Sequence, residues 1–186
     1  MKSAIYSAAL GLALLATPAF AHNGLVHGGC PVNQTFTAGD LSITGAFTRA
    51  MLPQAKVAGG YLVIENKGTA PDRLLGGNTA AAQVVQIHEM KMEGDMMKMS
   101  EVEGGLEIPA GGKVELAPGG FHVMLMGVGT PFKEGECLEL TLKFEKAGEV
   151  PVLLNVGGTA AAAAPEEGAM APMDGHDDHS MMAPAQ

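Results

Sequence analysis

The stretch FHVMLM (121–126) alternates one histidine and two methionines with apolar residues. On a β-strand, side chains two residues apart lie on the same face. His122, Met124 and Met126 therefore share one face, and the alternating apolar residues form the opposite, core-facing side. This spacing predicts an imidazole and two thioethers gathered on the side of a strand that faces away from the core.

Two further segments repeat this combination. In QVVQIHEM, alternation places His88 and Met90 on one face, opposite an apolar face. In MMKM, it places Met97 and Met99 on one face, opposite Lys98. Because a histidine or a methionine on its own is more often a packing residue, it is the recurrence of the pair that indicates a binding site.

Imidazole and thioether together form a soft donor set, which selects Cu(I) over cations that prefer oxygen ligands. Zinc sites are built from Cys, His and carboxylate, so methionine clusters argue against zinc. Unlike a thiolate, a thioether needs no deprotonation and cannot be lost to a disulfide. His88 and His122 are the histidines of the central part of the chain, and neither has a nearby Ser and Asp in sequence that would suggest a nucleophilic triad. We therefore predict metal binding and no enzymatic activity.

The elements that must position these residues are short apolar runs separated by Gly, Pro and Asn. CLELTLKFE alternates strictly, which is typical of a strand with one buried face. The pattern contains no convincing amphipathic helix and predicts an all-β fold, a cupredoxin-like or Greek-key β-sandwich. The predicted strands cover residues 41–47, 60–66, 83–90, 113–117, 121–128, 137–145 and 150–156.

The first 21 residues have the layout of a cleavable secretory signal. A positive start is followed by a short apolar run and by Ala19-Phe20-Ala21. The run is too short to span a bilayer, which needs about 20 apolar residues. We expect export to the periplasm, no stable membrane insertion, an irregular segment over residues 22–37, and the folded domain over 38–156.

Composition narrows the classes of partner. The formal net charge is −9 and the chain has no tryptophan, so it lacks the basic surface that nucleic-acid binding requires. Cys30 and Cys137 are its two cysteines. In an oxidising compartment an even count favours a disulfide. Two buried thiols, or two thiolate ligands, are the alternatives.

The composition changes at residue 157. Residues 157–186 are rich in Ala and Pro and acidic, and they lack Lys and Arg, which predicts a disordered tail. The tail carries further metal donors, and histidine and carboxylate suit Cu(II). The alternative is a solvated acidic end with incidental methionines. The predicted tail ligands are Met173, His176, His179 and Met181.

The ligand spacing resembles a known family, the periplasmic copper chaperones called PCuAC. Ten residues separate His88 from Met99, and 22 separate Met99 from His122, which is followed two residues later by Met124. The second spacer is one residue longer than in the usual family signature, and the addition falls in a turn-rich stretch. Framework segments are also similar, including APDRLLGG and FEKAGEV, so that the resemblance covers about residues 38–156.

The resemblance implies a cupredoxin-like sandwich that holds one Cu(I) through His88, Met99, His122 and Met124. It also implies delivery of copper toward the CuA centre of cytochrome oxidase, with a Sco-type thioredoxin-like protein and oxidase subunit II as partners. Passive copper sequestration for tolerance is an alternative function. An electron-transfer cupredoxin is a further one, although such sites use a Cys ligand that this signature lacks.

Overall fold

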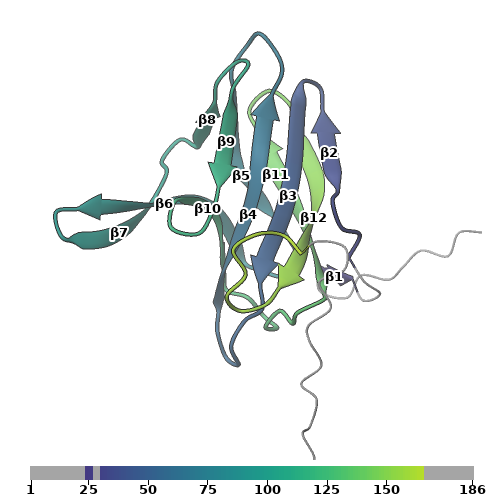
Figure 1. Cartoon of the computed structure of the whole chain (residues 1–186), viewed down its shortest axis with the longest axis vertical. Helices are drawn as coiled ribbons and strands as arrows, with labels where there is room; N and C mark the ends of the chain where they lie inside the picture. The colour runs from purple at the N-terminus through teal and green to yellow at the C-terminus, as the bar shows by residue number, and fades with distance from the viewer. Residues whose placement is uncertain (1–23, 27–29, 166–186) are drawn as a thin grey trace, which may run out of the picture.

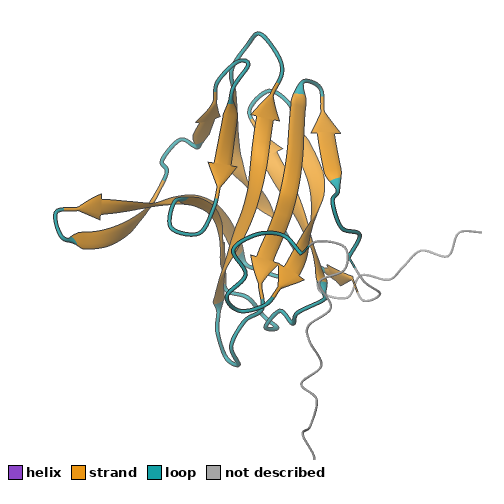
Figure 2. Cartoon of the chain, in the orientation of Figure 1, coloured by secondary structure: helices purple, strands orange, loops and turns teal. Residues whose placement is uncertain are grey.

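The computed structural model describes residues 24–26 and 30–165, which form strands and no helix (Figures 1 and 2). None of these residues lies in a helix that could cross a membrane. The all-β prediction is confirmed. The strands are β1 (Leu25–Val26), β2 (Thr35–Ala38), β3 (Leu41–Arg49), β4 (Val57–Asn66), β5 (Asp72–Asn78), β6 (Val84–Glu93), β7 (Met96–Glu101), β8 (Leu106–Ile108), β9 (Lys113–Leu116), β10 (Phe121–Met126), β11 (Cys137–Phe144) and β12 (Glu149–Gly157).

All strands belong to one continuous mixed sheet, in the order β7-β6-β10-β9-β4-β3-β12-β11-β5-β8, with β1 on β11 and β2 on β3. The β12–β3 and β10–β9 pairs are parallel and the others antiparallel. The sheet folds over on itself, since Gly76 and Gly77 of β5 lie against Val85 of β6. Side chains from both layers, such as Ile64 and Leu140, share one core.

Strand β11 shows how the sequence pattern produces this core. Leu138, Leu140, Leu142 and Phe144 are buried, while Glu139 and Lys143 between them are exposed. Burying a leucine side chain contributes about 1.5–3 kcal/mol, so a strand with this alternation is held in one register. A shift of one residue would expose the leucines and bury the charges.

Within the predicted irregular stretch over 22–37, the described residues include strand β1 and the start of β2. Strand β2 begins at Thr35, and Leu25 pairs with Leu138 and is buried. A two-residue strand is too short to produce a visible alternation. The predicted disulfide is confirmed, because Cys30 is bonded to Cys137 at the start of β11. It fixes this segment to the sheet.

The described structure continues past residue 156, the predicted end of the domain. Residue 157 is the last residue of β12, and residues 158–165 turn back onto the sheet. Arg49 donates from Nε to the carbonyl of Ala161 at 2.7 Å, and Ala161 packs against Gly157. The amino-acid composition changes at 157, but Arg49 binds the backbone carbonyl of Ala161, and every residue type has such a carbonyl. The change in composition therefore does not mark the end of the ordered chain. The predicted tail beyond 165 and the signal segment 1–21 lie outside the described residues.

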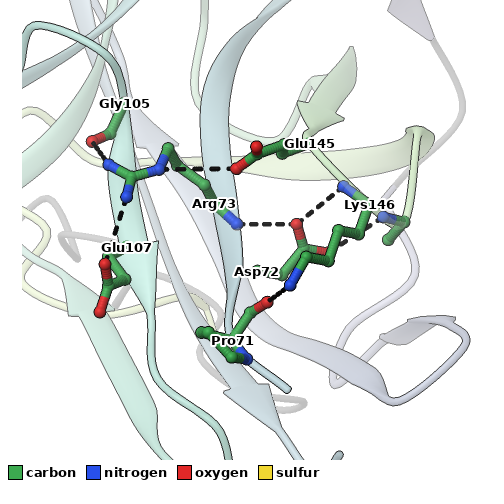
Figure 3. A network of polar contacts seen from close by, with 8 residues as sticks. Pro71, Asp72, Arg73, Gly105, Glu107, Glu145 and Lys146 are labelled. Atoms are coloured by element: carbon green, nitrogen blue, oxygen red, sulfur yellow. Dashed lines mark hydrogen bonds and ion pairs between the residues drawn. The ribbon is translucent and has the colours of Figure 1, made fainter.

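A polar network joins β5, β8 and the β11–β12 turn (Figure 3). Asp72 is buried and accepts hydrogen bonds from the backbone amides of Arg73, Lys146 and Ala147. Arg73 also pairs with Glu107 at 3.2 Å and with Glu145. The framework segments APDRLLGG and FEKAGEV therefore meet here. Exposed ion pairs contribute little, so the buried Asp72 is the part of the network that matters most for stability.

Strands β6 and β7 form a hairpin that projects from the sandwich (Figure 1). We refer to residues 89–100 as the arm. Its turn is Gly94-Asp95, and Gly94 has a φ of 62°, which suits the glycine position of a type II′ turn. Strand β6 runs to Glu93, past the predicted end at 90, because pairing with β7 extends it.

Candidate metal centre

The two histidines lie directly opposite each other. Strand β10 is paired on one side with β6, and the register places His122 opposite His88 and Met124 opposite Gln86. The two imidazole centroids are 6.0 Å apart. Residues that are 34 positions apart in sequence thus form one pair of nitrogen donors on a single face of the sheet.

The thioethers gather beside this pair. Met99 of β7 lies opposite Met90 of β6, two residues along from His88. Met90, Met99, His122 and Met124 line an open hollow of about 290 Å³. His88 does not line this hollow, and the β7 residue opposite it is Glu101. Three of the predicted domain ligands therefore share one hollow, and the fourth lies next to it, against His122.

His122 is buried, with 4% of its surface exposed. Its Nδ1 lies 3.1 Å from the carbonyl oxygen of Gly120. A carbonyl can only accept, so Nδ1 carries a proton, and Nε2 is the nitrogen that offers a lone pair when the ring is neutral. A hydrogen bond of this kind fixes the ring and presents the other nitrogen for metal binding.

His88 is oriented by a chain of side chains. Gln86 donates from its amide nitrogen to Glu101 at 2.8 Å, which turns its carbonyl oxygen toward His88. That oxygen lies 3.2 Å from His88 Nε2 and accepts a hydrogen bond from the Nε2–H group. Among the described residues, His88 Nδ1 is the buried side-chain polar atom without a hydrogen-bond partner. A buried hydrogen-bond acceptor without a partner lowers the stability of the fold, so Nδ1 is a candidate metal-binding atom.

The electrostatics keep His88 neutral. Burial lowers the pKa of the His88 imidazole from its ordinary value of 6.5, and His122 lowers it further, while Glu101 acts in the opposite direction. A neutral imidazole is the form that binds a metal ion. The same environment that leaves Nδ1 unpartnered therefore keeps its lone pair available at neutral pH.

Tyr61 is a residue of the hollow that the sequence analysis missed. Its ring lies over Gly59, where an added Cβ would come within 2.5 Å of the phenol oxygen. Phe47 packs on the ring at 5.0 Å between centroids, and the Arg49 guanidinium lies 5.7 Å above it. Gln86 was missed as well, although it shares a strand face with His88 and alternation could have identified it.

Among the described residues, no three His, Cys, Asp or Glu side chains gather in a way that could hold a metal ion. Met126 lies opposite Val84 and Val57 and does not line the hollow. The predicted tail ligands Met173, His176, His179 and Met181 lie outside the described residues. The candidate centre is thus composed of imidazole and thioether.

The fold and the family comparison together define the class of this protein. A family model described as "LpqE-like: Putative lipoprotein LpqE-like" matches residues 41–156. The chain is 31% identical to the copper-bound PCuAC domain from PmoF2, covering 67% of this chain and 98% of that domain, with a TM-score of 0.58. The chain therefore belongs to the LpqE-like family and to the PCuAC domains, which confirms the resemblance found in the sequence.

The chain is also similar to two further proteins. The solution structure of CuI-DR1885 from Deinococcus radiodurans is 30% identical, with a TM-score of 0.51, and the match covers 70% of this chain and 81% of that one. "Putative lipoprotein Lxx21020" of Leifsonia xyli subsp. xyli (strain CTCB07) is 36% identical over 93 residues. That match spans 50% of this chain and 56% of the relative.

Proposed function

We propose that this chain is a periplasmic copper chaperone that binds one Cu(I) through His88, Met99, His122 and Met124. The observation that carries the proposal is the pairing of His88 with His122, with an unpartnered buried nitrogen on the first ring. Copper-bound PCuAC relatives support copper as the cargo.

The donor set suits Cu(I) in particular. Two neutral imidazoles and two thioethers bring no negative charge, and soft thioethers favour the monovalent ion over Cu(II). His88 would bind through Nδ1 and His122 through Nε2, because the other nitrogen of each ring is engaged by Gln86 or Gly120. Each ring is thus held in place before the ion arrives.

A carrier must also release its ion. His122 is buried, but Met99 is 46% exposed and lies on β7, at the edge of the sheet. The hollow has room for several water-sized groups, since one water occupies about 30 Å³ of liquid. A partner could therefore displace Met99 first and take the ion while the histidines still hold it.

The arrangement of the cysteines disfavours electron transfer of the blue-copper type. That class requires a thiolate ligand, and the two cysteines of this chain are bonded to each other. Sequestration for tolerance uses the same ligands and differs only in the fate of the copper. The proposal has two further parts. The chain delivers copper toward the CuA centre, with a Sco-type protein and oxidase subunit II as partners, and its tail binds Cu(II).

A transfer assay tests delivery. The Cu(I)-loaded full chain is mixed with the apo CuA domain of oxidase subunit II, with a Sco-type protein and reductant. The reductant is then removed, the acceptor is reoxidised by one electron with air or ferricyanide, and the CuA absorption is measured. We expect CuA to form with the wild-type chain and not with a His122→Ala/Met124→Leu variant. Copper that stays on the chain while the acceptor remains empty would identify sequestration instead.

A further inference from the structure

The arm has two chemically different faces. One face carries Glu89, Lys91, Glu93 and Lys98, with ion pairs at 2.9 Å from Lys91 to Glu89 and from Lys98 to Glu93. This is an ordinary solvated strand surface. Met96 belongs to the same face, since it lies opposite Glu93.

The other face carries only methionines. Met92 lies directly opposite Met97, and Met90 lies directly opposite Met99. Directly opposed residues share a face, and their Cβ atoms are about 4.5–5.5 Å apart. Four thioethers therefore form two adjacent cross-strand pairs, the inner pair lining the hollow and the outer pair lying nearer the turn.

Packing does not account for the outer pair. Met92 is 57% exposed and Met97 is 51% exposed, and neither belongs to the core or packs against it. Methionine usually fills gaps inside a protein. Here two of them occupy the solvent-exposed end of a two-stranded arm, where polar side chains are more usual.

We propose that Met92 and Met97, completed by Met90, form a second binding site for a soft monovalent cation on the arm. Three unbranched thioether side chains can converge on one ion because each has three rotatable bonds. Such a site discriminates against Ca²⁺, Mg²⁺ and Zn²⁺, which want oxygen, nitrogen or thiolate donors. The identity of the natural cation as Cu(I), and the role in capture and transfer, rest on the proposed function.

The position of the site gives it a role. Met90 belongs to both groups, because it lines the hollow and lies two residues from Met92 on the same face. An ion held by the outer pair could thus pass through Met90 to the ligands of the hollow, which include His122. The outer site lacks histidine and is exposed, so it holds its ion more weakly than the centre does and serves for capture and transfer.

The test uses Ag(I), a redox-inert analogue of Cu(I), and the full chain carrying ¹³C-methyl methionine. The methyl signals, assigned by single Met→Leu variants, report each thioether separately, including those of the tail. We expect Ag(I) to shift the signals of Met92 and Met97 and to leave Met96 in place. Met96 is the matched control, since it is on the same arm and 74% exposed, but on the other face. In Met92→Leu, the shift of Met97 should fall several-fold, although leucine preserves the apolar surface.

A second variant separates this inference from the proposed function. His122→Ala/Met124→Leu removes the centre, and we expect the Met92 and Met97 signals still to respond to Ag(I). If those two signals stay in place at excess Ag(I), or move no more than Met96 does, the arm site does not exist. The proposed centre would still stand if, in the wild-type chain, the Met99 and Met124 signals respond to Ag(I).

Discussion

His88 and His122 face each other across the β6–β10 pair, with ring centroids 6.0 Å apart and with one nitrogen of each ring already engaged. Their orientation comes from Gln86 and from the Gly120 carbonyl, and neither contact involves the metal. The pair is therefore built into the apo fold.

Gln86 should control the affinity of the centre without binding the ion. Gln86→Leu removes the acceptor that fixes the His88 tautomer. Loss of such an outer partner typically costs 10–100-fold in metal affinity, and we expect a decrease of that order in a competition titration with a Cu(I) chelator. Gln34→Leu, which removes an exposed amide outside the centre, serves as the control. An unchanged affinity in Gln86→Leu would mean that Gln86 does not position His88.

The apo protein should lose stability in acid partly through His88. Its pKa is lowered in the folded state by burial and by His122, so the unfolded state binds more protons as the pH falls below about 6.5. The contribution of His88 is complete above that pH and is lost as the pH falls through the folded-state pKa. We expect the free energy of unfolding, measured with urea from pH 7.5 to 5, to fall less in His88→Asn than in the wild type. Equal slopes would contradict this account.

The Cys30–Cys137 bond should contribute strongly to stability. It closes a loop with a sequence separation of 107, for which chain entropy predicts up to about 4–5 kcal/mol. Reduction should lower the urea midpoint accordingly, while the oxidised protein shows no titratable thiol under denaturing conditions. Two reactive thiols in the denatured, oxidised protein would refute the bond.

The tail should bind Cu(II) independently of the centre. His176→Ala/His179→Ala should reduce Cu(II) binding and leave Cu(I) binding unchanged. Because imidazole must be neutral to ligate, tail binding should weaken below about pH 6.5. Isothermal titration at pH 7.5 and 5.5 measures both effects. Full Cu(II) binding after removal of residues 166–186 would place that site elsewhere.

Alternation predicted β10 and β6, because Val123, Leu125 and Ile87 face the core while His122 and His88 lie on the opposite face. It did not predict β5, where Gly76 and Gly77 interrupt the pattern, or the short strands β1, β2 and β8. The role of Tyr61 depends on which strands lie side by side, and one strand's sequence does not contain that information. Gln86 differs, because it lies two residues before His88 on the same strand, and the alternation in that strand could have identified it. The ordered turn at Ala161 likewise depends on Arg49, which is 112 residues away.

The most direct test of the central claim is a Cu(I) competition titration on a chain ending at Pro165, which keeps the Arg49–Ala161 contact and removes the tail donors. The account predicts one tightly bound Cu(I), lost in His122→Ala/Met124→Leu while circular dichroism shows the same β-fold. Tight binding of one Cu(I) by that correctly folded double variant would contradict the proposed centre.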